Sequence, residues 1–204
     1  MSVSVSLPII ARLFYEPMAV FRDLAQASPS APAVFFKLAI WLLILPPLFA
    51  FFGSSNFGWD LGADEPVRLA RGVLVAVSVA YFVTLIFGFI STAVVSRWMS
   101  QTYGAAENLG LHFALIALVG MPLLLGSAIH LYPHAFINLL VLAPALIWSM
   151  YLLYRGLPLV LGIDSQRGML MASALIGFLL VASVSLLGLT VVLWGHGIGP
   201  EVGI

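Results

Sequence analysis

Residues 72–96 read GVLVAVSVAYFVTLIFGFISTAVVS and stand between two basic residues, Arg71 and Arg97. These 25 residues include no charged side chain and no proline. At a rise of about 1.5 Å per residue, a helix of this length reaches about 37 Å, which exceeds the hydrocarbon core of a bilayer, about 30 Å thick. The stretch therefore predicts a transmembrane helix.

Small residues occupy every fourth position of this predicted helix. Positions four apart form one ridge, and helices in lipid associate where small side chains let two backbones approach closely. We therefore predict that the other helices pack against this one. The alternative is that the spacing is chance, since small residues are common in membrane helices. The predicted packing positions, which we call the small-residue ridge, are Gly72, Ala76, Ala80, Thr84, Gly88, Thr92 and Ser96.

The composition of the whole chain agrees with this class. Of the 204 residues, 62% are hydrophobic and only 8% are charged, which is typical of a polytopic membrane protein. Eight Lys and Arg balance eight Asp and Glu, so no basic excess indicates a nucleic-acid partner. The absence of cysteine excludes disulfides, thiolate metal sites and lipid anchors on cysteine.

We predict an all-α fold with two parts. Residues 1–31 form a cytoplasmic amphipathic arm, in which 5–27 make one or two short helices with a boundary near Glu16, because Pro17 disfavours helical geometry in the preceding residue. The apolar face of the arm fits either the membrane surface or a site on the bundle. Residues 32–204 form a bundle whose five transmembrane spans cover about 33–53, 72–96, 109–131, 135–154 and 168–194.

Several residues mark the ends of these helices. Asn108 is the expected N-cap of the third span, and Asp164 or Ser165 that of the fifth. The apolar segment 156–162 is too short to cross the membrane. It either lies at the interface or continues the fourth helix past a bend at Pro158.

Five spans place the two termini on opposite sides of the membrane. With the N-terminus inside, only Arg68 and Arg71 lie in outer segments. Basic residues prefer the cytoplasmic side, so we predict the inner membrane, with the N-terminus in the cytoplasm and the C-terminus outside. The basic residues then on the inner side are Arg12, Arg22, Lys37, Arg97, Arg155 and Arg167.

The predicted spans carry little sign of chemistry. None contains Asp or Glu, which argues against proton- or ion-coupled transport. Prolines in spans one, three and four are found in the broken helices of transporters, but also in ordinary kinks. His112 is expected to lie at the membrane interface or to make a packed hydrogen bond, and Asn138 is expected to bond across helices. We expect no enzymatic activity and no cofactor, because no serine stands in a nucleophile turn such as G-x-S-x-G; those considered are Ser91, Ser127, Ser149 and Ser183.

A group of potential metal ligands falls on the predicted outer side. Imidazole and carboxylate suit zinc or a similar divalent ion, although Pro133 disrupts the helical spacing that would aim two of the histidines at one metal. Our main interpretation is that these are solvated loop residues without metal, and the alternative is a divalent-cation site. The histidines are His130, His134 and His196, and the acidic residues are Asp60, Asp64 and Glu65.

Three passages carry a resemblance to a known family. They are ARLFYEPMAVFRDLA (11–25), NLGLHFALIALVGMPLLLGSAIHLYP (108–133) and YLLYRGLPLVLGIDSQRGMLMASALIGF (151–178). In layout they resemble the bacterial side of the Yip1 family of five-span membrane proteins, which implies no catalytic residue. Eukaryotic members are associated with Rab-type small GTPases and vesicle traffic, and they carry a longer cytosolic N-terminal region. We do not expect a small GTPase as a partner of this chain.

Two functions follow from these features. The first is a membrane scaffold or adaptor that is embedded in the lipid bilayer and packs with itself or with other membrane proteins. The alternative is a small transporter or channel, for instance for a divalent cation. A pore needs polar residues that converge on an interior path, whereas a scaffold needs small or apolar faces exposed to lipid.

Overall fold

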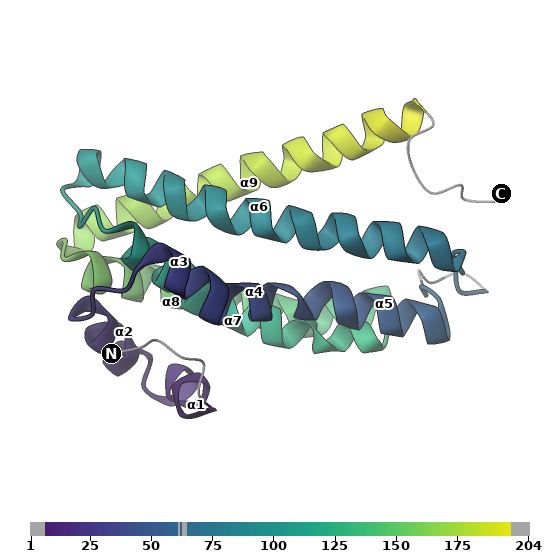
Figure 1. Cartoon of the computed structure of the whole chain (residues 1–204), viewed down its shortest axis with the longest axis horizontal. Coiled ribbons are helices and arrows are strands. Elements are labelled where there is room, and N and C mark those ends of the chain that lie inside the picture. Colours follow the sequence, from purple (N-terminus) through teal and green to yellow (C-terminus); the bar gives the residue numbers. More distant parts are fainter. Residues whose placement is uncertain (1–6, 61, 63–64, 197–204) are drawn as a thin grey trace.

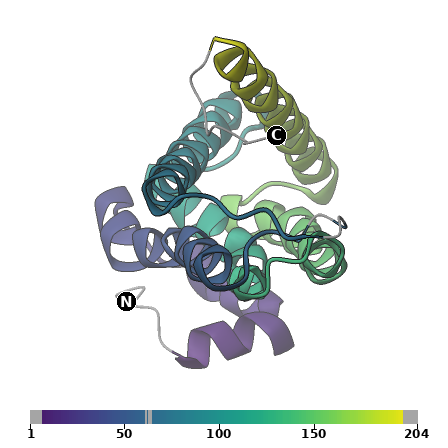
Figure 2. The same ribbon diagram turned by 90° about the vertical axis from the view of Figure 1, so that its right-hand side faces the viewer.

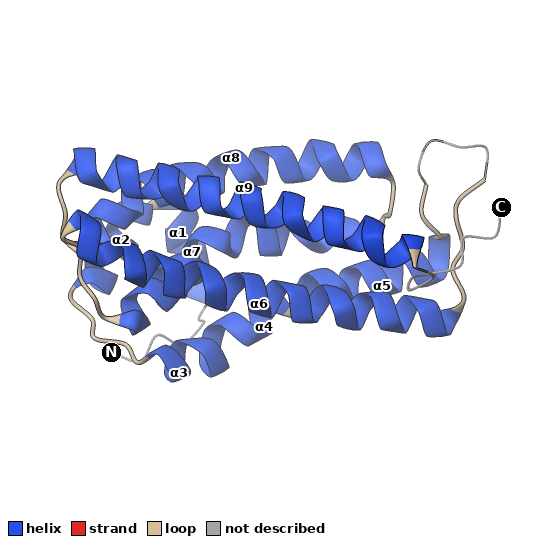
Figure 3. Cartoon of the chain, turned by 90° about the horizontal axis from the view of Figure 1, so that it is seen from above, coloured by secondary structure: helices blue, strands red, loops and turns tan. Residues whose placement is uncertain are grey.

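The structure is a computed structural model that describes residues 7–60, 62 and 65–196. These residues are helical with short connections, and they contain two isolated β-bridges but no strand (Figure 3). Among them, five helical segments are long and apolar enough to cross a membrane: Ala31–Phe57, Arg71–Tyr103, Leu109–Leu131, Ala135–Leu161 and Ser165–Leu193. The predicted all-α, five-span fold is therefore confirmed.

The first segment is an irregular helix built from α3 (Ala31–Val34), the π-helical η1 (Phe35–Ala39), α4 (Ile40–Leu43) and α5 (Leu45–Phe57). In η1 the N–H of Ile40 reaches back five residues to the carbonyl oxygen of Phe35. The indole Nε1 of Trp41 donates to the neighbouring carbonyl of Phe36 at 3.1 Å. The indole of Trp41 thus satisfies a carbonyl group of the π turn inside the membrane, where an unpaired carbonyl would cost free energy.

The other segments are longer helices. They are α6 (Arg71–Tyr103), α7 (Leu109–Gly126) with the 3₁₀ turn η2 (Ser127–Leu131), α8 (Ala135–Leu161) and α9 (Ser165–Gly195). The segment 156–162 continues the fourth helix as far as Leu161, which decides between the two alternatives left open by the sequence. Gly104 and Gly162, both with φ of +70°, end α6 and α8 in the left-handed conformation that glycine adopts without strain.

The expected helix caps are present. The side chain of Asn108 accepts a hydrogen bond from the backbone N–H of Gly110 at 2.8 Å. Asp164 accepts from the backbone N–H groups of Gln166 and Arg167, both at 3.0 Å. The hydrogen bond from Arg167 is the main reason why the pKa of Asp164 lies below its ordinary value.

The centre of the bundle is α7, not α6. More than half of its most apolar segment is buried (56%), against 11% for α6. Helix α7 contacts α6, α8, α2 and every part of the first segment. The prediction that 72–96 is the helix against which the others pack is therefore wrong.

Helix α9 leaves the bundle along its length (Figures 1 and 2). Its first half contacts α6 and α8, and buries Met171, Ala172 and Leu175. From Leu179 onward nearly all of its described side chains are exposed. In a membrane these apolar side chains face lipid, so the helix needs no further protein contact to be stable.

The N-terminal arm is docked on the bundle. It consists of α1 (Leu7–Tyr15) and α2 (Pro17–Ala25), which meet at Glu16 as predicted. The apolar face of α2 packs against α8 and α7, where Phe21 is fully buried. The structure therefore favours the second of the two alternatives for the arm, an amphipathic segment that shares the core of the bundle.

Four glycines allow the closest contacts between segments. A Cβ atom placed on Gly110 would lie 1.8 Å from the carbonyl oxygen of Pro29, and one on Gly53 would lie 2.0 Å from that of His130. A Cβ on Gly156 would lie 2.6 Å from the Phe21 ring, and one on Gly168 would lie 2.5 Å from Pro158. Only glycine fits at these contacts, which join the first segment, the arm and α7, α8 and α9.

Candidate functional site

Polar side chains gather at the two opposite ends of the bundle, buried at one end and mostly half-buried at the other. We call the end that carries α1 and α2 the arm end, and the end that carries residues 58–60 and 132–134 the loop end (Figure 1). The arm-end cluster consists of Ser96, Ser100, His112 and the carbonyl group of Ala106. The loop-end cluster consists of Asp60, His130, His134 and Asn138.

His112 is the centre of the arm-end cluster and is fully buried. Its Nε2 lies 2.9 Å from the carbonyl oxygen of Ala106 and 3.2 Å from Ser100 Oγ, and its Nδ1 lies 2.8 Å from Ser96 Oγ. A carbonyl oxygen only accepts, so Nε2 carries a hydrogen. A neutral ring then accepts the hydroxyl hydrogen of Ser96 at Nδ1. The packed hydrogen bond expected for His112 is present.

The same cluster holds the turn between α6 and α7. Ser100 Oγ donates to the carbonyl oxygen of Ala106 at 3.1 Å, and Arg97 Nε donates to that of Glu107 at 3.0 Å. The backbone N–H of Ala106 donates to the carbonyl oxygen of Leu161 at the end of α8, at 2.9 Å. The cluster thus fixes three helices relative to one another at the arm end.

In chemical terms, Ser96 and His112 have the spacing of a nucleophile and a general base, with the Ala106 carbonyl orienting the ring. Both side chains are fully buried, so no substrate reaches them in this conformation. The geometry therefore suits a structural connection between α6 and α7. The four serines considered from the sequence do not include Ser96. Ser96 and Ser100 are four residues apart, on one face of a helix, and His112 follows after a short loop, so the sequence did carry a signal for this cluster.

The loop-end cluster fixes the first loop to the turn between η2 and α8. His130 Nδ1 is hydrogen-bonded to Asn138 Oδ1, and Asn138 Nδ2 donates to the carbonyl oxygen of His134 at 2.9 Å. His134 Nε2 lies 3.7 Å from Asp60 Oδ2. The backbone N–H of Asp60 donates to the carbonyl oxygen of Pro133 at 2.9 Å. Asn138 of α8 thus bonds across to His130 of η2 and to the turn that joins the two helices.

Between the two clusters the core is mostly apolar, with the buried Ser149 of α8 as an exception. Phe89 of α6 and Phe113 of α7 pack edge to face, with ring centroids 5.2 Å apart. Farther along α7, Leu115 and Met121 are fully buried. Thr92, which is also buried there, donates its hydroxyl to the carbonyl oxygen of Gly88 at 2.6 Å, so it does not extend either cluster.

A comparison with known families places this architecture. The model of the Yip1 domain matches residues 11–187, which include α2 to α8, most of α9 and both polar clusters. The chain belongs to the Yip1 family. The family match names no catalytic activity.

Curated relatives of this Yip1-family chain are bacterial. It is 30% identical over 153 residues to "Inner membrane protein YohC" of Escherichia coli K12, covering 75% of this chain and 78% of the relative. The same figures hold for the protein of that name in Escherichia coli O6:H1, strain CFT073. No solved structure matches this chain.

The structure gives the predicted metal candidates of this Yip1-family protein separate surroundings. His130 and His134 contact different partners at the loop end, and His196 Nδ1 lies 2.8 Å from the carbonyl oxygen of Val192 on α9. Within residues 7–60, 62 and 65–196, no three His, Asp or Glu side chains converge on a point where a metal ion could bind. Asp64 lies outside the described residues, and Glu65 is exposed in the loop.

The small-residue ridge is only partly covered by the chain itself. Thr92 and Ser96 are buried against the bundle, and Gly88 is half-buried. A Cβ atom on Gly72 or Gly88 would have no neighbour within 4 Å. The loop-end part of the ridge is exposed at Gly72, Ala76, Ala80 and Thr84. Its role in packing remains a prediction.

Proposed function

We propose that this Yip1-family protein is a scaffold or adaptor of the inner membrane, without enzymatic activity, that packs with itself or with other membrane proteins. The observation that carries the proposal is the loop-end part of the small-residue ridge, where α6 offers a shallow face that none of the residues described by the structure covers. Such a face lets a second helix approach closely, which is how helices associate in lipid.

The alternative function, a small transporter or channel, needs a polar path through the bundle. The two polar clusters lie at opposite ends, and bulky apolar side chains such as Phe113 and Met121 fill the core between them. Ser96, Ser100 and His112 are hydrogen-bonded to one another at the arm end, and His130 is hydrogen-bonded to Asn138 at the loop end. This arrangement supports a scaffold function over that of a pore, whether for a divalent cation or for any other ion.

Substitution of Gly88 by Leu tests the proposal. Because the space beside Gly88 is open within one chain, we expect the monomer to fold, whereas a partner helix at the ridge would meet about four extra heavy atoms. Overpacking of that kind costs about 1 to 3 kcal/mol, so the dissociation constant of a complex should rise about 5- to 150-fold. The measurements are thermal aggregation in detergent, expression level, and the fraction of cross-linked complexes in membranes.

The matched control is Phe87→Leu, since Phe87 is 67% exposed and lies outside the ridge. Leucine is favourable in lipid at either position, so hydrophobicity is held constant. We expect this variant to behave as the natural protein does. If both variants associate equally well, the spacing of small residues carries no interface and the scaffold proposal loses its main support.

The proposed orientation is N-terminus in the cytoplasm and C-terminus outside. It rests on the unequal distribution of basic residues, because six lie in the segments assigned to the cytoplasmic side and only Arg68 and Arg71 in those assigned to the outer side. We expect a reporter that is active only in the cytoplasm to work when fused to the N-terminus, and an export-dependent reporter to work at the C-terminus. Activity of both fusions on one side of the membrane would contradict the orientation.

A further inference from the structure

We propose that one ordered water molecule is bound between α7 and α8, where it joins the side chain of Ser149 to the backbone carbonyl of Leu118. Ser149 is a buried polar residue in the mostly apolar core between the two clusters, and it is only 5% exposed. Its hydroxyl has no hydrogen-bond partner among the residues that the structure describes. A buried polar group without a partner costs free energy inside a membrane, so the hydroxyl needs one.

A proline in the facing helix leaves a second group without its usual partner. Pro122 lies inside α7 and is buried. Because proline has no N–H, the carbonyl oxygen of Leu118, four residues earlier, loses its helical hydrogen bond, and the helix bends there. In membrane helices such carbonyls are satisfied by neighbouring helices, by Ser or Thr side chains, or by ordered water.

The packing of α7 on α8 brings the two groups to the same level of the bundle. The helices are antiparallel neighbours, and a Cβ atom on Gly126 would lie 3.4 Å from the Cβ of Ala145. Pro122 and Ser149 each lie one turn deeper than this contact, on the same faces, because residues four apart in a helix share a face. Ser149 therefore faces α7 close to the bend at Pro122.

Water fits between these groups because it can pair with both. The Ser149 hydroxyl has no partner in its present position, so it does not satisfy the Leu118 carbonyl directly. A water molecule accepts the hydroxyl hydrogen, donates one of its own to the carbonyl oxygen, and has a second hydrogen for another acceptor.

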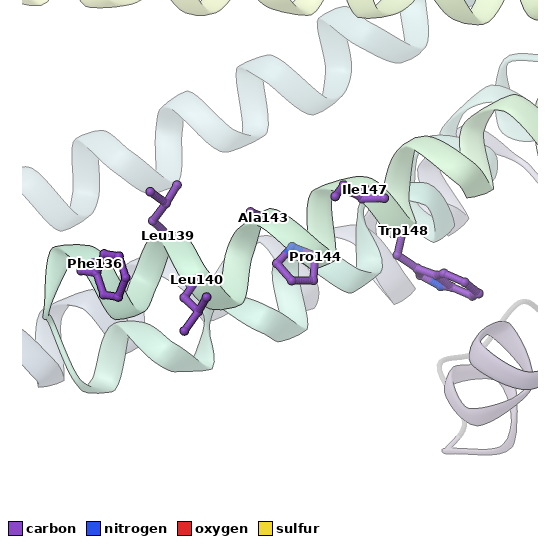
Figure 4. A pocket seen from close by; sticks show the side chains of 7 residues that line it. All are labelled: Phe136, Leu139, Leu140, Ala143, Pro144, Ile147 and Trp148. Atoms are coloured by element: carbon purple, nitrogen blue, oxygen red, sulfur yellow. The ribbon is translucent and has the colours of Figure 1, made fainter.

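The site is internal. The shallow groove on the outer surface of α8 (Figure 4) lies on another face, where Leu140 and Ile147 are each more than 60% exposed. The site also shares no residue with the small-residue ridge of α6. The inference is therefore independent of the proposed scaffold function.

The first test is a double-mutant cycle of Ser149→Ala and Pro122→Ala, measured as the melting temperature in detergent. Ser149→Ala alone should lower the melting temperature by about 3 °C, the usual effect of one lost hydrogen bond in a chain of this size. With Pro122→Ala, the N–H of residue 122 satisfies the Leu118 carbonyl, so adding Ser149→Ala should have a much smaller effect. An equal effect in both backgrounds would mean that the hydroxyl bonds to its own helix, and it would overturn the proposal.

The matched control is Ser91→Ala. Ser91 Oγ donates to the carbonyl oxygen of Gly88 in its own helix, at 3.1 Å. Its removal should lower the melting temperature by the same amount with and without proline at position 122, because the two sites share no partner.

A second measurement reports on the water itself and needs no change at Pro122. X-ray radiolysis converts bound water into hydroxyl radicals, which oxidise neighbouring side chains even inside a protein. Met121, next to Pro122, and Met171 of α9 are both fully buried. We expect Met121 to be oxidised several-fold faster than Met171, and this excess to disappear in Ser149→Ala but not in Ser91→Ala. Similar rates for the two methionines in the natural protein would overturn the proposal.

Discussion

Replacing Gly110 by alanine should destabilise the folded protein by about 3 kcal/mol or more, the upper end of what overpacking usually costs. The added Cβ would lie 1.8 Å from the carbonyl oxygen of Pro29 and 2.6 Å from its carbonyl carbon. Both are backbone atoms, so no side chain can rotate away, and the turn before α3 must lift off α7. We expect a lower melting temperature in detergent. We also expect faster tryptic cleavage at Arg22, because the arm would detach more easily from α7 and α8.

The control for this variant lies in the same helix. A Cβ on Gly120 would have only Leu124 Cδ1 nearby, at an ordinary 3.8 Å. Gly120→Ala should therefore leave stability equal or slightly greater, because alanine favours helix more than glycine does. A similar loss for both variants would show that the contact at Pro29 is not what makes Gly110 special.

The second large effect is expected for His112→Leu. Leucine has about the volume of histidine but leaves the buried Ser96 hydroxyl without its partner, and it removes one of the two hydrogen bonds to the Ala106 carbonyl, which keeps the bond from Ser100. An unsatisfied buried hydroxyl costs about 1 to 3 kcal/mol and the lost hydrogen bond to Ala106 about 1 kcal/mol, so we expect a loss of about 3 kcal/mol in all. Thermal unfolding in detergent measures it, with His196→Leu at the exposed end of α9 as the near-neutral control.

A smaller loss for Ser96→Ala, about 1 kcal/mol, should accompany it, because this change removes one hydrogen bond and leaves the ring bonded to Ala106. If His112→Leu were as stable as the natural protein, the cluster would not hold α6 and α7 together. The buried Ser–His geometry would then need another explanation.

The number of spans and their ends could be predicted because they depend on local features. Length and hydropathy identify a crossing helix, and Asn108 and Asp164 cap the helices that follow them because their carboxyl and amide oxygens reach the first free N–H groups. Extents were harder to predict. Helix α8 continues to Leu161, since a proline such as Pro158 bends a helix in the membrane without having to end it.

Which helix lies at the centre could not be predicted from the ridge. In lipid an exposed helix and a buried one are both apolar all round, so hydropathy does not separate them. The glycines show the same limit. Gly88 and Gly110 look alike in sequence, yet the first faces open space and the second a backbone oxygen. That difference arises from how distant segments cross.

The polar clusters were predictable only in part. His112 and Asn138 were expected to form packed hydrogen bonds because buried polar groups need partners. Which serine pairs with His112 depends on the crossing of α6 and α7, and so the pair with Ser96 was missed. The outer histidines were grouped by their predicted side of the membrane, but His130 is hydrogen-bonded to Asn138 whereas His134 lies beside Asp60, so the two rings do not converge.

The docking of the arm on α7 and α8 has a consequence for the order of events during synthesis. Helix α2 leaves the ribosome early, but the notch at Gly156 that receives Phe21 is made near the end of the chain. At about 5 to 20 residues per second, the arm waits on the order of ten seconds for its binding site. During that time its apolar face has no binding site on the protein, and we expect it to lie on the membrane surface beside the growing bundle. One amphipathic pattern must therefore serve twice, first on lipid and then on protein.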